Sequence, residues 1–275
     1  MTSILRFYVM PDSHPPVEEA GSLLFNQSLE KGLAVLAAFS AVRRTMTIGE
    51  VAEAAGITKS SAQRMVFTLE HLGYLRKHPK TRRYQLTPRV MRIGFNYLAA
   101  DPLIDVANPF LSELTKLTTE TTCLTEPDQA DMVYVARFVS AQFVPVHMPI
   151  GSRIPMYCTG SGRAYLSALP EGEALTLIER SERVAHTPHT RTDVAEIVAT
   201  LREARQRGYA INCEELFHGD MTLAAPVIAG NGRPLGAIHV VAPTSRWSLE
   251  EAQARLAPPL LQSARAISSS VRALG

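Results

Sequence analysis

The stretch TIGEVAEAAGITKSSAQRMVFTLEHLGYL, residues 47–75, decides the fold of the first part of the chain. Its first four residues have the Thr-x-x-Glu spacing of a capping box, in which threonine and glutamate satisfy free backbone groups at a helix start. We predict a short helix here that stops at Gly56, and a second helix that is capped by Thr58 and runs to about Leu72. A helix, a glycine turn and a helix form a helix-turn-helix motif.

The second helix is predicted to present a polar face to solvent. Ser60 and Ser61 lie near its N-terminus, where hydroxyls and free backbone N–H groups can bind phosphate. Gln63 and Arg64, one turn further on, can reach base edges in a major groove. With the two caps, the predicted DNA contacts of this motif are Thr47, Thr58, Lys59, Ser60, Ser61, Gln63 and Arg64.

A basic hairpin follows the motif. Residues 74–78 and 84–86 have the composition of two short strands, and the turn between them reads PKTRR. Lys80, Arg82 and Arg83 are predicted at the tip of this wing, where they suit the phosphate backbone or the minor groove. Any one of these elements alone fits an ordinary solvated face. The ordered series of capped helix, glycine turn, polar helix and basic hairpin favours a DNA-binding module.

Further helices are predicted on both sides of this module. Ser28 is the predicted N-cap of a first helix over residues 28–40, whose leucines share one face. A threonine-proline pair starts a linker helix over residues 88–101, because proline suits the first helical position. Another helix with apolar residues at helical spacing follows over residues 103–117.

Charge divides the chain into unlike parts. The whole sequence of 275 residues has a formal net charge of +2 and is 46% hydrophobic, as in an ordinary globular protein. Residues 26–97 hold twelve Lys and Arg against four Asp and Glu, whereas residues 98–275 hold fifteen against nineteen. The basic segment indicates a polyanionic partner, double-stranded DNA, for that segment alone.

The sequence predicts a cytoplasmic protein that does not contact a membrane. Its longest stretch without a charged residue, 138–152, contains two prolines and is shorter than the roughly 20 apolar residues of a membrane span. Residues 1–25 lack the pattern of a secretory leader and are predicted to be a disordered tail. Three cysteines without a Cys-x-x-Cys pair favour reduced thiols.

From about Thr121 the pattern changes to short apolar strands between helices. Strands are predicted at residues 132–136, 143–148, 223–228 and 235–241. Helices are predicted at residues 161–169, 171–181 and 193–207. The second part of the chain is therefore expected to be an α+β domain with a mainly antiparallel sheet.

These segments resemble the IclR family of bacterial transcription regulators. The resemblance rests on residues 28–39, 47–75, 84–94, 151–170 and 207–243. It implies a winged helix-turn-helix over residues 26–87, a linker helix over 88–101 that helps to pair subunits, and a GAF-like effector-binding domain over 102–275. It also implies a homodimer or homotetramer that binds operator DNA and responds to a small carboxylic acid.

The resemblance also places an effector pocket. It maps the pocket onto Gly160, Ser161, Asn212, Thr222, His239 and Val241. The TGSG segment at 159–162 precedes a predicted helix, where free N–H groups and small side chains let a carboxylate approach the backbone. Members that bind glyoxylate-like acids tend to have cysteine at 222 and serine at 239 and 241, so this pocket differs in shape. The YCT run at 157–159 with the Gly-Arg pair at 162–163 is closer to members that control aromatic-acid breakdown through the β-ketoadipate route, which favours an aromatic or dicarboxylic acid.

No catalytic, cofactor or metal site is predicted. His186 and His189 could share a helical face, but a proline lies between them and no further ligand is near, so exposed loop histidines are expected. Cys158 and Cys213 are expected in the core or the pocket wall, and the adjacent carboxylates at 214–215 are expected to point apart. The TGSG segment lacks the third glycine of a dinucleotide loop. The alternative is a GAF-like sensor or enzyme whose basic module binds another protein.

Overall fold

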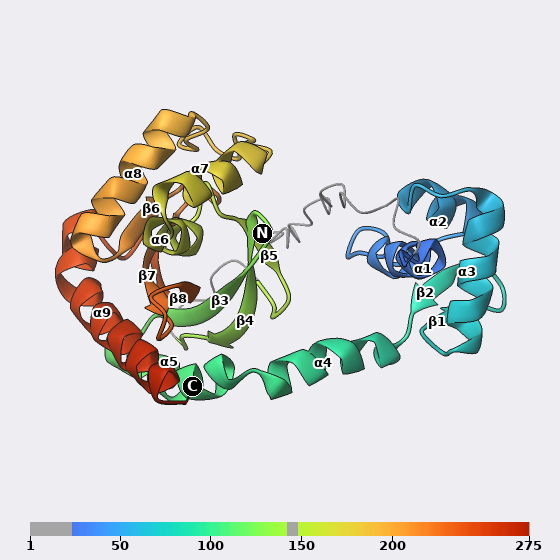
Figure 1. The fold of residues 1–275 in the computed structure, drawn as a ribbon, viewed down its shortest axis with the longest axis horizontal. Helices are drawn as coiled ribbons and strands as arrows, with labels where there is room; N and C mark the ends of the chain where they lie inside the picture. The colour runs from blue at the N-terminus through green and yellow to red at the C-terminus, as the bar shows by residue number, and fades with distance from the viewer. Residues whose placement is uncertain (1–23, 142–147, 275) are drawn as a thin grey trace. The chain divides into compact units, whose positions relative to one another are not determined.

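The computed structural model describes residues 24–141 and 148–274 (Figure 1). Contacts within the chain divide it into two compact units, the first ending at Ala99 and the second beginning at Ala100. The predicted disordered tail at 1–25 and the predicted strand at 143–148 lie almost wholly outside the described residues.

The first unit begins with the helices α1 (Gln27–Ala37), α2 (Ile48–Ala54) and α3 (Lys59–His71), which are followed by a hairpin of β1 (Leu75–Lys77) and β2 (Tyr84–Leu86). The capping box predicted at the start of α2 is present, since Thr47 Oγ1 accepts from the Glu50 amide and the Glu50 carboxylate accepts from the Thr47 amide. Thr58 caps α3, as predicted. Gly56 has a φ of +62°, which lets the chain turn between the two helices.

The start of α1 differs from the prediction. Asn26 and not Ser28 caps the helix, because the Asn26 side-chain oxygen accepts hydrogen bonds from the amides of Ser28 and Leu29 at 3.0 and 3.1 Å. Ser28 lies inside the helix, and its own amide is one of the groups that the cap satisfies. The helix also ends at Ala37 and not at residue 40.

A small apolar core holds the first unit together. Val35 of α1, Val51 of α2 and Val66 of α3 are all fully buried in it. The hairpin is attached at Tyr84, whose backbone exchanges hydrogen bonds with Met46 at 2.7 and 2.9 Å. The wing is therefore fixed to the chain just before α2.

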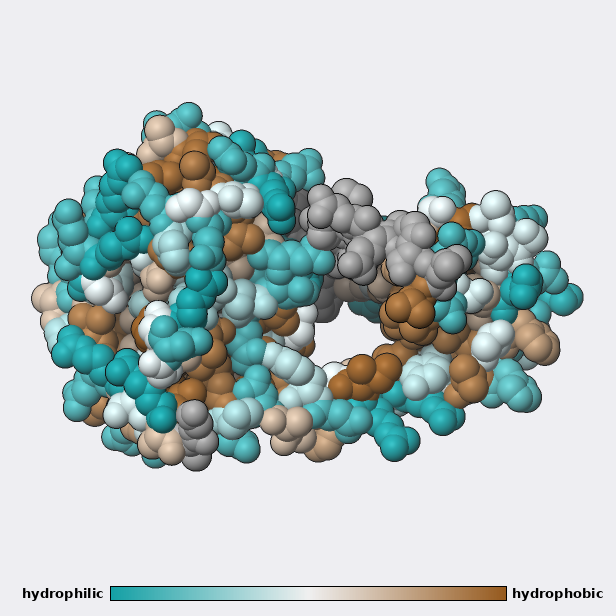
Figure 2. Space-filling model, in the orientation of Figure 1, coloured by the Kyte–Doolittle hydropathy of each residue, from teal (hydrophilic) through white to brown (hydrophobic). Residues whose placement is uncertain are grey.

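A linker follows the hairpin. It consists of a 3-10 turn, η1 (Pro88–Val90), and the helix α4 (Met91–Ala100). The Thr87 hydroxyl caps the turn and donates to the carbonyl of Gly73 at 2.6 Å. Four large hydrophobic side chains are exposed along α4: Met91, Ile93, Phe95 and Tyr97. Figure 2 shows brown, hydrophobic surface along part of this helix. Met91 and Phe95 lie on one side of the helix, and Ile93 and Tyr97 lie on the other. Exposed apolar side chains in such number are typical of a protein interaction surface.

The second unit is built on one antiparallel sheet with the strand order β5-β4-β3-β8-β7-β6. The strands are β3 (Thr121–Asp128), β4 (Asp131–Phe138), β5 (Arg153–Pro155), β6 (Ala210–Cys213), β7 (Asp220–Ile228) and β8 (Pro234–Pro243). The helices are α5 (Pro102–Thr118), α6 (Gly160–Ala168), α7 (Glu171–Arg180), α8 (Val194–Arg207) and α9 (Leu249–Leu274). This is the predicted α+β class.

Helices cover both faces of the sheet (Figure 1). The helices α5 and α9 pack together on one face, against β3, β4, β7 and β8. The helix α6 packs against β7 and β8 from the other side, so that alternate residues of these strands face it. None of the helices in the described ranges is long and apolar enough to cross a membrane.

Candidate functional site

The outer face of α3 is polar and exposed. Lys59, Ser60, Gln63 and Arg64 are exposed, and Ser61 is half-buried. The opposite side of the helix, with Ala62, Val66 and Leu69, is buried in the core of the first unit. The fold therefore directs the predicted base-reading side chains to solvent.

Three hydroxyl groups gather at the N-terminus of α3. Thr58 Oγ1 accepts from the amide of Ser61 at 3.3 Å and lies 3.1 Å from Ser60 Oγ and 3.0 Å from Ser61 Oγ. Hydroxyl rotors beside a helix N-terminus can turn toward an incoming phosphate, whose charge the helix dipole also favours.

The three basic residues of the wing are not equivalent. Arg83 donates to Thr45 Oγ1 at 3.1 Å, to the Thr45 carbonyl at 2.9 Å and to the Glu50 carboxylate at 2.9 Å. The hydrogen bonds from the Thr47 amide and from Arg83 lower the pKa of Glu50 to about 2. Lys80 and Arg82 remain exposed. Arg83 thus holds the wing against α2, whereas Lys80 and Arg82 are the side chains presented to solvent.

In the second unit, the start of α6 lies close against β7. Thr159 caps the helix, since its Oγ1 accepts from the Gly162 amide and donates to the Pro155 carbonyl. A Cβ atom added at Gly160 would lie 2.5 Å from Thr222 Oγ1. Only glycine allows this approach of helix to strand.

Between α6 and the sheet lies a cavity of two lobes. The lobes measure about 20 and 30 Å³ and share Tyr134, Phe217, Asp220 and Thr222. One lobe is also lined by Gly160, Ser161, Asn212 and His239, and the other by Cys123, Arg137, Met148 and Val241. All six residues predicted for the effector pocket therefore line one lobe or the other, and each lobe holds little more than a water molecule.

Two polar atoms in the first lobe lack a partner among the described residues: Ser161 Oγ and His239 Nδ1. Both side chains are almost completely buried, with 2% and 1% exposure. A buried polar group without a hydrogen bond costs about 1–3 kcal/mol, so a ligand that bonds to both is favoured here. Asn212 differs from them, because its amide donates to the Cys158 carbonyl at 2.9 Å and fixes the loop before α6.

Three further residues that line the cavity were not predicted from the sequence: Cys123, Arg137 and Asp220. Arg137 projects from β4, donates to the Met148 carbonyl at 3.1 Å and lines the second lobe. Burial, with a smaller contribution from the Arg137 charge, lowers the pKa of His239 to about 4, so its imidazole is neutral at pH 7. Burial raises the pKa of Asp220 to about 7 and that of Cys123 to about 12. A charged residue within the apolar run MVYVARF was the available signal for Arg137.

The residues that had suggested other chemistry lie elsewhere. Glu215 is buried in an ion pair with Arg163, and Glu214 points away to accept from the Gly219 amide. The Tyr157 hydroxyl lies 2.9 Å from His186 Nε2. Cys158 is buried as predicted, but the prediction is wrong for Cys213, which is exposed on the edge strand β6.

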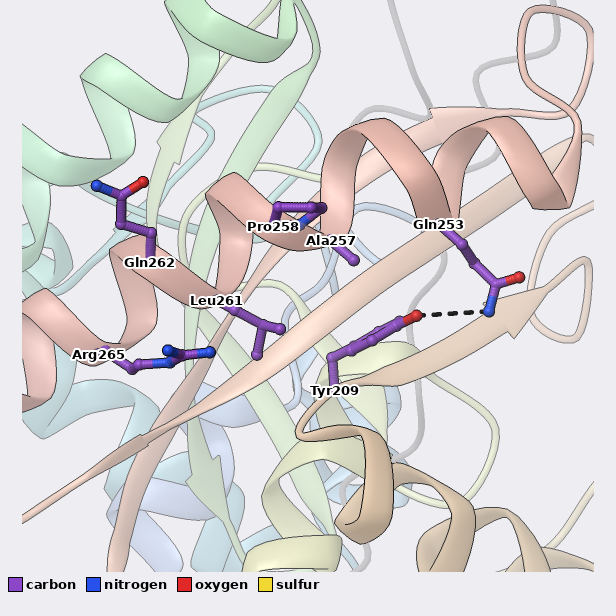
Figure 3. Close-up of a pocket in the computed structure, with 7 residues that line it drawn as sticks. All are labelled: Tyr209, Gln253, Ala257, Pro258, Leu261, Gln262 and Arg265. Carbon is purple, nitrogen blue, oxygen red and sulfur yellow. Dashed lines mark hydrogen bonds between the residues drawn. The ribbon is translucent and has the colours of Figure 1, made fainter.

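A larger hollow lies on the α9 side of the sheet, away from this cavity. It measures about 600 Å³ (Figure 3). Its lining residues are Tyr209, Gln253, Ala257, Pro258, Leu261, Gln262 and Arg265. Gln253 donates to the Tyr209 hydroxyl at 3.4 Å. The hollow is open to solvent, and no buried unpaired polar atom of the described residues lines it.

A winged helix-turn-helix in one unit and a cavity with buried unpaired polar atoms in the other are typical of a DNA-binding regulator that responds to a small molecule. Comparison with known families agrees. The IclR helix-turn-helix domain matches residues 28–79, and the bacterial transcriptional regulator IclR C-terminal domain matches residues 95–269. The chain belongs to the IclR family, whose members are transcription regulators and not enzymes.

Individual relatives are similar over most of their length. The Pca regulon regulatory protein of Pseudomonas putida is 30% identical over 88% of this chain and 82% of its own. The p-hydroxybenzoate hydroxylase transcriptional activator of Acinetobacter baylyi is 33% identical over 85% of this chain and 88% of its own. The crystal structure of a transcriptional regulator from Rhodococcus sp. RHA1 has 33% identity and a TM-score of 0.78, and covers 91% of this chain and 100% of its own.

Proposed function

We propose that the protein is a homodimer or homotetramer that binds operator DNA in the bacterial cytoplasm and controls a catabolic operon in response to an organic acid. Two winged helices would contact half-sites about one DNA turn apart. The hydroxyl cluster at the start of α3, with Lys80 and Arg82, would bind phosphates, and Gln63 and Arg64 would contact base edges.

The cavity between α6 and the sheet is the proposed effector site. The observation that carries this proposal is the pair of buried unpartnered atoms, Ser161 Oγ and His239 Nδ1, beside the N-terminus of α6. A helix N-terminus favours a carboxylate. Thr222 and Val241 complete the walls.

The residues that line the second lobe indicate which class of acid binds. Its Arg137 guanidinium is a second place for an anionic or hydrogen-bonding group. Tyr134 and Phe217, which line both lobes, provide aromatic surface between these two polar ends. An acid with polar groups at both ends, such as a hydroxybenzoate or a six-carbon dicarboxylate, could bind the unpaired atoms of the first lobe and Arg137 of the second at the same time. Two relatives named for p-hydroxybenzoate hydroxylase and for Pca genes support this class.

A thermal-unfolding panel of the full-length protein tests this assignment. The panel holds benzoate, 4-hydroxybenzoate, adipate and glyoxylate, and a true effector at 100 times its dissociation constant stabilises by about 2.7 kcal/mol. We expect stabilisation by 4-hydroxybenzoate or adipate, a smaller effect of benzoate and none of glyoxylate. Ser161→Ala and His239→Ala should each reduce the shift, whereas Gln253→Ala in the open hollow should not. Stabilisation by glyoxylate alone would contradict the proposal.

The effector must also change DNA binding. We propose that it biases the orientation of the two winged helices through the linker α4, with a coupling of about 1–3 kcal/mol. Fluorescence anisotropy with DNA from upstream of the protein's own gene, with and without the stabilising acid, measures this coupling. No binding to such DNA in either state would contradict the regulatory role.

A further inference from the structure

The recognition helix α3 exposes one large hydrophobic side chain. Phe67 is 70% exposed although the core of its unit is complete without it. Residues three, four and seven apart share a face of a helix, so Phe67 lies on the side that holds Ser60, Gln63 and Arg64. The buried side of the helix, with Ala62 and Val66, faces the other way.

The surroundings of Phe67 do not fit a protein interface. Its neighbours three and four positions away are Gln63, Arg64, Glu70 and His71; all four are polar, and all except the half-buried Glu70 are exposed. Protein interfaces have a contiguous apolar centre with few charges. In the first unit such a surface lies on α4 and not on this face. A single phenyl ring within a polar face that also carries Arg64 instead suits a target that is itself mostly polar and displays one apolar group.

We propose that Phe67 packs against the C5-methyl group of a thymine in the major groove and so determines sequence preference at that position. Thymine alone among the four bases displays a methyl group there. Contact removes the phenyl ring and the methyl group from water together, which favours thymine over cytosine and over purines. The inference rests on the proposed function, because it requires α3 to enter the major groove.

Substituting deoxyuridine for thymine tests the contact, because it removes the methyl group and leaves base pairing unchanged. The full-length protein first selects its preferred duplex from a random pool. Each thymine of that duplex is then replaced by deoxyuridine, and affinity is measured by fluorescence anisotropy. We expect one position per half-site at which the wild type loses about four-fold in affinity, the factor that corresponds to burial of one methyl-sized group.

A double-mutant cycle assigns the loss to Phe67. Phe67→Ala should bind the thymine and deoxyuridine duplexes equally, and Phe67→Leu should keep part of the preference. Val42→Ala, at another exposed apolar residue of the same unit, should retain the full four-fold difference. Because Phe67 is exposed, the variants should unfold at the same temperature as the wild type.

The outcomes separate this inference from the proposed function. Enrichment of no sequence at all would overturn DNA reading by α3 as a whole. Enrichment of a motif in which no thymine is sensitive to deoxyuridine, or in which Phe67→Ala keeps the wild-type sensitivity, would overturn the Phe67 contact alone.

Discussion

Arg83 carries the same positive charge as Lys80 and Arg82, but within the part of the chain that the structure describes it has intramolecular partners that they lack. Three hydrogen bonds hold the Arg83 guanidinium to Thr45 and Glu50. A phosphate that drew Arg83 away would leave the Glu50 carboxylate without its cation. Lys80 and Arg82 form no ion pair with the described residues, so they can meet phosphate without losing a partner.

Salt dependence should separate these roles. Lys80→Ala and Arg82→Ala should each reduce the slope of log affinity against log salt concentration by about one, without a change in thermal stability. Arg83→Ala should leave that slope nearly unchanged and lower the stability of the first unit by about 1 kcal/mol or less, as for an exposed ion pair. Anisotropy over a salt series and thermal unfolding measure both. A full unit of slope lost in Arg83→Ala, at unchanged stability, would show that Arg83 contacts phosphate.

Asp220 should make effector binding depend on pH. Among the ionisable groups that line the cavity beside Arg137, His239 has its pKa lowered to about 4, and Cys123 and Tyr134 have their pKa values raised. Asp220, with a pKa raised to about 7, changes charge near neutrality. As pH rises through 7, ionised Asp220 repels an anionic acid, so affinity should fall between pH 6 and 8.

Calorimetric titration at several pH values measures this effect, with Asp220→Asn as the control that should remove it. The stability of the folded protein should also decrease as pH rises. The folded protein holds the Asp220 proton more tightly than the unfolded chain does, so this contribution declines as pH rises from about 4 to about 7. An affinity for the acid that is constant from pH 6 to 8 in the wild type would exclude Asp220 from the binding equilibrium.

At the scale of elements, the position of α6 on the sheet depends on the absence of a side chain at Gly160. Gly160→Ala places a Cβ atom 2.5 Å from Thr222 Oγ1, so the helix or the strand must shift. We expect a loss of about 1–3 kcal/mol in stability and a weaker effector response. Adding Thr222→Ala to the Gly160→Ala variant should restore part of the stability and part of the effector response. Gly172→Ala in α7, where a Cβ would meet nothing within 4 Å, is the control in the same unfolding and ligand-shift measurements.

Elements with strong local signals were predicted well from the sequence. The predicted caps Thr47 and Thr58 are present because a cap needs only residues within one turn. The helix α9 was missed because its two internal prolines, Pro258 and Pro259, indicate a break. The strand β3 was missed because its threonines and proline are also common in loops. Its strand conformation depends on pairing with β4 on one side and β8 on the other.

The partners of site residues were harder to predict than the elements. The distance along the chain is the reason: Arg83 meets Glu50, 33 residues away, and Asn212 meets the Cys158 carbonyl, 54 residues away. The spacing of apolar and polar residues along the sequence does not predict hydrogen bonds between residues this far apart. The resemblance to the IclR family placed six residues around the cavity, whereas Arg137 and Asp220 became visible only through the fold.

For the whole molecule, the apolar surface of α4 predicts how subunits pair. Phe95 is 66% exposed, and burying such a side chain stabilises by about 1.5–3 kcal/mol. Phe95→Asp should therefore weaken dimerisation and lower affinity for a duplex with two half-sites. Asn96→Asp, which adds the same charge at the adjacent exposed position, should have a much smaller effect. Sedimentation velocity and anisotropy measure both, and a Phe95→Asp protein that stays dimeric would place the subunit contact elsewhere.

The two lobes of the proposed effector cavity, about 20 and 30 Å³, are too small for an organic acid unless the walls move. Entry must therefore wait for an opening motion, and the observed binding rate should level off as the acid concentration is raised. Dissociation of the acid requires the same opening motion. A regulator of this kind filters out brief pulses of the acid, and it keeps its operon in the responding state for a time after the acid has been consumed.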